Sequence, residues 1–293
     1  MSGAFPTDDP VEVPIIMRAL EPEVFDAVFS AVEPLLPEPI TTHPLGCHRP
    51  RVSDRICLWA MLVRLVTGCS WVDAERLVGG VSDTTLRTRR DEWGAAGVLE
   101  RLAEMMLGTY NEAIGLHCEE LSVDGSIHKA PCGGEGTGKS PVDRGKLGWK
   151  WSIATDEVGI PIGWLADRAN HNDCVLLPAT LDEVERHGLL GAVGTLHLDR
   201  GYDNPVVHRQ VAALGIVLDV AKRRRHGTTA GAKAPVALGR RWAVERTNSW
   251  LSNYGQLRRD TDRSTAHRRA QLAFVIAILL IVKLMDRGLR AAA

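Results

Sequence analysis

The sequence lacks the marks of a secreted or membrane-spanning protein. Its six cysteines contain no Cys-x-x-Cys pair and no spacing of a disulfide framework, as expected in a reducing cytosol. The acidic, proline-rich N-terminus does not resemble a signal peptide. The one strongly apolar run, residues 272–282, is too short to cross a bilayer and lies between basic residues, so it predicts a buried helix. We therefore expect a cytoplasmic protein with no membrane partner.

A zinc centre and a repeat architecture are also disfavoured. His43, Cys47 and His48 lie close together in the sequence, but no second pair of ligands follows at the spacing of a zinc site. No segment recurs at a fixed period, which argues against a solenoid or a propeller. The chain has 293 residues, of which 45% are hydrophobic, so it can bury a sizeable core in one large or two modest domains.

Positive charge is scarce in the first two thirds of the chain and abundant in the last third. From residue 200 to the end there are 18 Lys and Arg against 6 Asp and Glu, whereas the rest carries 17 against 30. A solvated basic surface would account for scattered arginines. Clustering favours phosphate contact instead, so we expect DNA as a polyanionic partner. The densest basic run comprises Lys222, Arg223, Arg224 and Arg225.

Three short helices are predicted between residues 54 and 93. Apolar residues recur at helical spacing, Ser70 and Ser82 stand at N-cap positions, and glycines separate the helices. This order is typical of a helix-turn-helix DNA reader, although any three-helix bundle with a basic surface would look the same. With a fourth predicted helix, residues 1–115 would form an all-helical, DNA-binding domain. The third helix carries the side chains expected to contact DNA, namely Arg87, Arg89 and Arg90.

Strand-like patterns begin after Gly115. Short runs of β-branched and aromatic residues come first, and helices then alternate with strands. Strands in a meander followed by such alternation suit an α/β fold, with a mixed sheet flanked by helices. Only about twenty residues separate Val220 from Arg240, so no further β-domain fits before the last helices. Residues 116–293 are therefore predicted to form a single α/β domain.

Three carboxylates stand where a metal site could be built. Asp124 and Asp199 lie at the ends of strand-like runs, and Glu245 lies in an amphipathic helix, four residues after Arg241. On an arbitrary helix, an Arg–Glu pair at this spacing is usually just an exposed ion pair. Two strand-end carboxylates and a later helical one instead make an oxygen-rich site of the kind that binds magnesium.

Four short motifs follow one another between roughly residues 119 and 262. They are Val-Asp-Gly-Ser at 123–126, Ser-Pro-Val-Asp-Arg-Gly-Lys at 140–146, Leu-Asp-Arg-Gly-Tyr-Asp at 198–203 and Arg-Trp-Ala-Val-Glu-Arg-Thr at 241–247. In this order they resemble the DDE transposases of bacterial insertion sequences, specifically the four/five superfamily. The resemblance implies a ribonuclease-H-like fold with a catalytic, metal-binding triad of Asp124, Asp199 and Glu245. Leu238 and Ser252 depart from the broader superfamily, which often has Tyr and a basic residue there.

The resemblance implies a transposase that cuts DNA at the ends of its insertion sequence and joins the freed 3′ ends to target DNA. The triad would hold two magnesium or manganese ions, roughly 3.5 to 4 Å apart, and Arg241 or Arg246 would offset phosphate charge. The helical domain would bind the element's terminal repeats. We expect a homo-oligomer in the synaptic complex and association with the nucleoid. The alternative is a catalytically inactive or domesticated transposase that acts only as a sequence-specific DNA-binding protein.

Residues 133–140 match the Walker A pattern of nucleotide-binding loops letter for letter. Such a loop holds phosphate only where a strand leads in and a helix leads out. Pro141 and the glycines at 145 and 148 leave no room for that helix. We therefore expect a flexible loop near the active site, and no ATP. The cations in and after this loop are expected to contact the DNA backbone; they are Lys139, Arg144 and Lys146.

Overall fold

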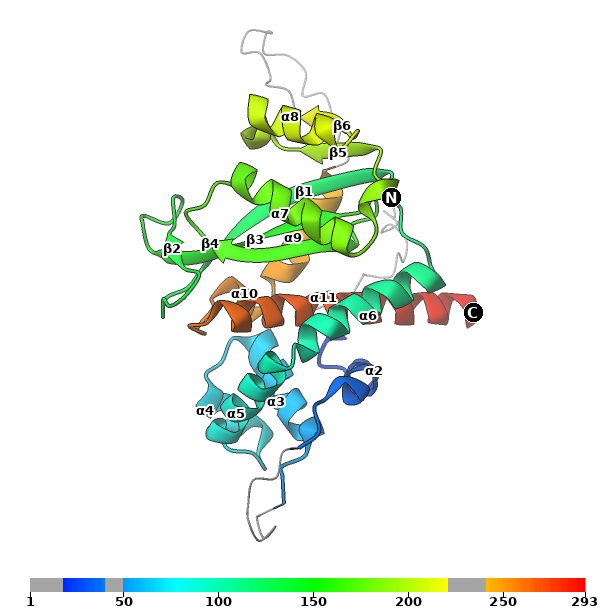
Figure 1. Ribbon diagram of the computed structural model, residues 1–293. Helices are drawn as coiled ribbons and strands as arrows, with labels where there is room; N and C mark the ends of the chain where they lie inside the picture. Colours follow the sequence, from blue (N-terminus) through cyan, green and yellow to red (C-terminus); the bar gives the residue numbers. More distant parts are fainter. Residues whose placement is uncertain (1–17, 40–49, 221–240, 293) are drawn as a thin grey trace, which may run out of the picture.

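The computed structural model describes residues 18–39, 50–220 and 241–292 (Figure 1). Some residues singled out above lie outside this part of the chain: the basic run 222–225, Leu238, and the cluster of His43, Cys47 and His48. Figure 1 shows a mixed sheet at one end and a group of short helices at the other. Two long helices, α6 (Val98–Ala113) and α11 (Thr265–Ala292), lie between them.

The N-terminal helices follow the predicted outline. Ser70 Oγ accepts the N–H of Asp73 at 3.1 Å, and Ser82 Oγ accepts that of Thr85 at 3.2 Å, so both predicted N-caps are confirmed. Gly68 ends the first of the three helices at a φ of 75°, a left-handed conformation that glycine adopts without strain. The helices before α6 are α2 (Pro22–Val32), α3 (Asp54–Thr67), α4 (Trp71–Val78) and α5 (Asp83–Ala95).

The sheet has the ribonuclease-H-like strand order. The strands run in the spatial order β4-β3-β1-β5-β6, with the short β2 paired to the start of β3. Neighbours β4, β3 and β1 are antiparallel, whereas β1, β5 and β6 are parallel. An antiparallel meander that continues into a parallel half is the predicted mixed sheet, so the fold class is confirmed. The strands are β1 (Glu120–Lys129), β2 (Gly138–Lys139), β3 (Leu147–Thr155), β4 (Pro161–Arg168), β5 (Thr195–Leu198) and β6 (Val217–Val220).

Helices cover both faces of the sheet. Successive side chains of β3 point to opposite faces, as the pleat of a strand requires. Trp151 donates its indole N–H to Asn248 of α9 (Trp242–Ser252) at 2.8 Å. The next residue, Ser152, accepts a hydrogen bond from Thr180 of α7 (Asp173–Arg186) at 2.7 Å. The helix α8 (Pro205–Ala213) connects β5 to β6. The α9 face is the one that carries the carboxylates discussed below.

The helix α11 joins the two ends of the molecule. It packs along α6 and also contacts α2, α5 and β4. Its residues 272–282 are at most 4% exposed, which confirms the predicted buried helix. Among the described residues, no helix is both long and apolar enough to cross a membrane. The hydrophobic core runs from the N-terminal helices into the sheet as one cluster and so marks no boundary between two domains. The predicted domain boundary between residues 115 and 116 therefore stays a prediction.

A short helix, α10 (Gly255–Arg258), is pressed against the turn that follows α3. A Cβ added to Gly255 would lie 2.6 Å from the carbonyl carbon of Thr67, and its closest neighbour would be the backbone of Gly68. Gln256 also donates from Nε2 to the carbonyl oxygen of Cys69 at 3.3 Å. The close approach of the Gly255 and Gly68 backbones fixes the segment after α9 relative to α3 and α4.

We expect Gly255→Ala to destabilise the protein by about 1 to 3 kcal/mol, the usual cost of overpacking. The atoms that the new methyl group would meet are backbone atoms, which cannot rotate away. Urea or thermal unfolding measures the change. Gly108→Ala, inside α6 with nothing within 4 Å of its Cβ, is the matched control and should stabilise by about 1 kcal/mol. A Gly255→Ala protein as stable as the wild type would contradict the contact.

Candidate active site

Asp124 lies within β1, and a side chain from α9 holds its carboxylate. Asn248 donates from Nδ2 to Asp124 Oδ2 at 3.1 Å and accepts the Trp151 indole N–H at Oδ1. The Trp151 ring is stacked on that of His128, with centroids 3.7 Å apart. Burial lowers the pKa of His128 to about 3, so this ring is neutral near neutral pH. A chain of uncharged groups therefore orients the carboxylate.

The surroundings of Asp124 oppose its negative charge. Burial raises its pKa to about 6, and the nearby carboxylates of Asp199 and Asp173 act in the same direction. The Arg241 guanidinium and the N–H of Gly125 act in the opposite direction. Carboxylates this close together carry excess negative charge, and their oxygens are the ligands that hard divalent cations prefer. The ligand chemistry of these side chains therefore suits magnesium or manganese.

Asp199 follows β5 directly, and β5 is the parallel neighbour of β1. Its Oδ1 accepts the N–H of Gly201 at 2.7 Å, which fixes the turn after the strand. Tyr202 in this turn is buried, and burial raises its pKa. The negative charges of Asp173, Asp124 and Asp199 raise it further. The Tyr202 side chain therefore lies in the negative field of these carboxylates.

Glu245 lies on the same stripe of α9 as Asn248. Arg241, Glu245 and Asn248 are separated by four and three residues, so their side chains share one face of the helix. Glu245 Oε1 lies 3.3 Å from an Arg241 guanidinium nitrogen, and the Glu245 side chain is 55% exposed. Among the described residues, no group of three His, Cys, Asp or Glu side chains is placed to hold a metal ion. The fold places Asp199 close enough to Asp124 for their charges to repel, whereas the Glu245 side chain is paired with Arg241.

Sequence reasoning missed three residues of this region. Asn248 is one, and Asp173, the first residue of α7, is another. The Asp173 Cγ would lie 2.9 Å from a Cβ on Gly125, so the close approach requires glycine there. The third is Lys150, which is 2% exposed and donates from Nζ to Asp173 Oδ1 at 2.7 Å. A lysine within an otherwise apolar strand was the one signal that could have revealed this pair.

Arg246 is turned away from the carboxylates. Its guanidinium carbon lies 4.1 Å from the ring centroid of Trp242 and 4.6 Å from that of Trp250, one turn before and one turn after it on α9. It also donates to the carbonyl oxygen of Val158, in the turn between β3 and β4. Of the two arginines expected to offset phosphate charge, Arg241 is therefore the one that lies beside Asp124.

The expectation that Arg89 is presented for DNA contact is wrong. Arg89 is 3% exposed, forms an ion pair with Asp54 and lies on the protein side of α5. The physical reason is its position on the helix. It follows Leu86 by three residues and precedes Trp93 by four, and both of these are buried, so it shares their stripe.

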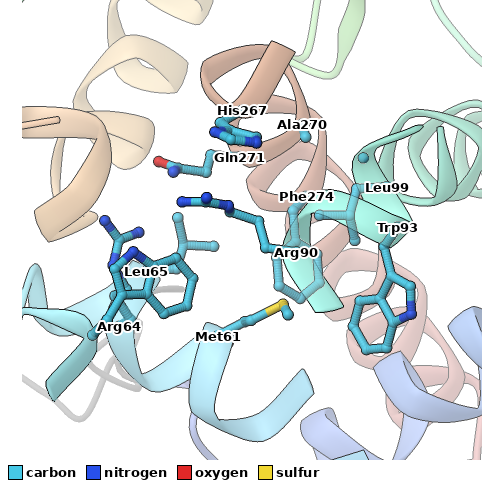
Figure 2. Close-up of a pocket in the computed structure, with 12 residues that line it drawn as sticks. Met61, Arg64, Leu65, Arg90, Trp93, Leu99, His267, Ala270, Gln271 and Phe274 are labelled. Atoms are coloured by element: carbon cyan, nitrogen blue, oxygen red, sulfur yellow. The ribbon is translucent and has the colours of Figure 1, made fainter. Parts of the chain in front are cut away.

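Arg90 is also directed inward. Figure 2 shows its side chain in a small pocket between α3, α5 and α11, beside Arg64, Gln271 and His267. Its guanidinium lies 2.9 Å from Asp262, and its side chain is 21% exposed. Arg87 alone of the three is well exposed, paired with Asp83 at 3.1 Å. The outward surface of α5 therefore presents one of the three predicted arginines.

The glycine-rich loop 133–140 is held in place by α11. Arg268, which is 1% exposed, donates to the carbonyl oxygens of Gly133, at 3.0 Å, and Glu135. An arginine distant in the sequence thus anchors the backbone of this loop, while its predicted flexibility stays a prediction. No helix lies between Ser140 and β3, all of which is described, so the loop lacks the context of a nucleotide-binding P-loop. Its predicted DNA contacts all lie at the surface, namely Lys139, Arg144 and Lys146.

We expect Asp124→Asn to be more stable than the wild type at about pH 8 and equally stable at about pH 4. The folded-state pKa of Asp124, about 6, lies above the ordinary 3.8, so the folded protein binds this proton more tightly than the unfolded chain. The wild type therefore loses stability as the pH rises from about 4 past 6, by roughly 2 to 3 kcal/mol. Thermal unfolding with a chelator present measures the difference. A variant that is less stable than wild type at high pH would contradict the burial of this charge.

Comparison with known proteins agrees with this arrangement. Residues 24–103 match a family model described as a provisional "transposase of IS4/5 family", and residues 119–282 match the model "Transposase DDE domain". The chain is 36% identical over 128 residues to a Burkholderia cepacia protein provisionally named "transposase for insertion sequence element IS402". That match covers 42% of this chain and 57% of the relative, so the chain spans little more than half of that protein's length.

Two further similarities were found. A second Burkholderia cepacia protein, "Insertion element IS402 uncharacterized 16.2 kDa protein", is 33% identical over 121 residues, covering 41% of this chain and 82% of the relative. A solved structure, "Crystal structure of a pre-cleavage Mos1 transpososome", is 10% identical with a TM-score of 0.26, covering 84% of this chain and 82% of that one. A TM-score this low supports no conclusion about fold or function. The DDE-domain model matches more than half of the 293 residues, and the chain therefore belongs to the DDE transposase family.

Proposed function

We propose that this protein is an active transposase that cuts DNA at the ends of its insertion sequence and transfers the freed strands to target DNA. The single observation that carries the proposal is the placement of Asp124. It lies in β1, Asp199 directly follows the parallel neighbour β5, and Asn248 ties Asp124 to the helix that carries Glu245. An assembly of acidic side chains on two adjacent strands and a later helix suits phosphodiester chemistry at a divalent cation.

Asp124 and Asp199 are the residues we assign to hold the cations, magnesium or manganese. Glu245 completes the set when it leaves Arg241, since an exposed ion pair of this kind is held by less than about 1 kcal/mol. Two bound cations supply activation of the nucleophile and stabilisation of the leaving oxygen. Arg241 remains beside Asp124, where its charge can meet a non-bridging phosphate oxygen.

The DNA contacts are assigned to exposed cations. Arg87 on α5 is the proposed contact to the terminal repeats, and Lys139, Arg144 and Lys146 are proposed to meet the phosphate backbone. The basic run at residues 222–225 is proposed to add sequence-independent affinity. The proposal includes a homo-oligomer in the synaptic complex and a reaction without ATP, because the energy comes from exchange of phosphodiester bonds.

The alternative is an inactive transposase that acts only by binding DNA. The carboxylates near the partly buried Asp124, which repel its charge, argue against it. A group whose pKa is raised to about 6 by burial and by other carboxylates is costly to keep charged in a protein that makes no use of it. A binding-only protein would also show the same DNA affinity and no strand cleavage with or without divalent cations.

Asp124→Asn, Asp199→Asn and Glu245→Gln should each reduce strand cleavage by several orders of magnitude, since each removes one negative charge from the same site. Binding of element-end DNA should persist, because the proposed DNA contacts lie elsewhere. A gel assay of a labelled element end with magnesium or manganese measures cleavage, and a binding assay on the same variants measures affinity.

Asp203→Asn is the matched control for the triad. Asp203 is exposed, and its Oδ1 lies 2.9 Å from His208 Nε2, so loss of its charge should leave cleavage nearly unchanged. If a triad variant cut as fast as the wild type, or if Asp203→Asn were the inactive one, the assignment of the site would be wrong.

Asn248→Ala should slow cleavage by about 10- to 100-fold, the usual effect of removing a group that orients a ligand. The substitution leaves the Trp151 N–H without its acceptor and frees the Asp124 carboxylate to turn. Part of the activity should be recovered at higher manganese concentration, because the substitution removes orientation rather than charge. A wild-type cleavage rate would show that Asn248 does not position Asp124.

A further inference from the structure

A groove of about 390 Å³ lies where the end of β1 meets the end of α10. Its walls come from three parts of the chain: the last residues of β1, the turn between β2 and β3, and the C-terminus of α10. The groove-lining residues used below are Lys129, Arg258, Arg259, Ser140 and Asp143. It is separate from the carboxylates, since none of Asp124, Asp199 and Glu245 lines it.

The groove is strongly cationic. Lys129, Arg258 and Arg259 are all exposed, and none of them takes part in an ion pair among the residues that the structure describes. Asp143 is the one carboxylate among the lining residues, and Lys146 already faces it at 3.9 Å. Three uncompensated cations on one groove attract an anion, and guanidinium groups suit phosphate oxygens in particular.

The backbone that carries these cations is fixed on both sides. Lys129 and Arg259 form a parallel β-bridge, and the Asp260 N–H donates to the Lys129 carbonyl oxygen at 2.9 Å. On the other side, α10 is locked to the turn after α3 by the Gly68–Gly255 contact described above. The groove is therefore rigidly connected both to the strand of Asp124 and to the proposed DNA-reading helices.

The position of the groove suits a DNA strand that leads to the active site. Lys129 follows Asp124 by five residues on β1, a separation of about 16 Å in an extended strand. This distance corresponds to about five base-pair steps of duplex DNA at 3.4 Å each. In Figure 1, α10 lies between the sheet and the group of α3, α4 and α5.

We propose that the groove binds backbone phosphates of the element-end DNA, about five base pairs from the phosphate that reacts. This inference rests on the proposed function. Lys129, Arg258 and Arg259 neutralise the phosphates, and the groove thereby sets the distance between the sequence read by the helices and the point of cleavage.

The first experiment measures DNA affinity as a function of salt for the wild type and the variant Lys129→Gln/Arg258→Gln/Arg259→Gln, with a random-sequence duplex as probe. The slope of log affinity against log salt should become shallower by about 0.9 for each phosphate that is no longer neutralised, or about 2 to 3 in all. Arg209→Gln, an exposed arginine on α8, is the control for a charge change outside the groove and should leave the slope unchanged.

The second experiment locates the bound phosphates on an element-end duplex. Single neutral methylphosphonates replace the phosphates one at a time along the strand. The wild type should lose affinity when the replaced phosphate lies about five base pairs from the cleaved bond, and the triple variant should be insensitive to that same replacement. Arg258→Gln alone should show a smaller effect of the same kind if the triple variant folds poorly.

The results of the two experiments distinguish a failure of the groove assignment from a failure of the proposed function. If the wild type cuts element ends while the triple variant keeps the wild-type slope and the wild-type sensitivity to methylphosphonate, the groove assignment is wrong and the function stands. If the wild type binds DNA but never cuts, the proposed function fails, and an unchanged slope in the triple variant would overturn the groove as well. If the wild type binds no DNA, both fail.

Discussion

A buried cluster of opposite charges around Asp262 connects the distant parts of the molecule. Asp262 pairs with Arg64 of α3 at 3.2 Å and with Arg90 of α5 at 2.9 Å, and Arg268 of α11 lies 3.3 Å from Asp260. Asp260 is fully buried, and burial together with the charge of Asp262 raises its pKa to about 7. Removing one partner of such a cluster costs about 3 to 5 kcal/mol, because a charge then stays buried alone. The helices, the segment before α11 and the glycine-rich loop therefore keep one common arrangement.

The carboxylates of the active site have unequal support. Pairing with Ile153 of β3 fixes the backbone of Asp124, and a hydrogen bond from the buried Asn248 fixes its side chain. Asp199 directly follows β5, and its Oδ1 accepts the Gly201 N–H. Glu245 has only an exposed ion pair with Arg241, which contributes less than about 1 kcal/mol. The two strand carboxylates are thus preorganised, while the helical one is free to exchange partners. In a site that we propose to accept both DNA and cations, the least supported side chain is the one that can adjust.

Local features of the sequence were predictable, whereas contacts between distant segments were not. The caps at Ser70 and Ser82 follow from patterns within a few residues. The burial of Arg89 was also implied by helical spacing, but its charge was given more weight than its place on the helix. The Lys150–Asp173 pair joins β3 to α7, and the only local sign of it was a lysine within a mostly apolar strand. The glycine content of the 133–140 loop gave no sign of its hydrogen bond to an arginine more than a hundred residues later.

The contact between Gly68 and Gly255 limits how the two halves of this protein can be exchanged. Each glycine lies within a different matched family model, at residues 24–103 and 119–282. A chimaera that takes its N-terminal helices from one relative and its sheet from another keeps α10 against α3 only if both donors supply a residue without a side chain. The group of N-terminal helices is therefore not a freely transferable module. It is inherited together with a short helix that lies nearly two hundred residues later in the chain.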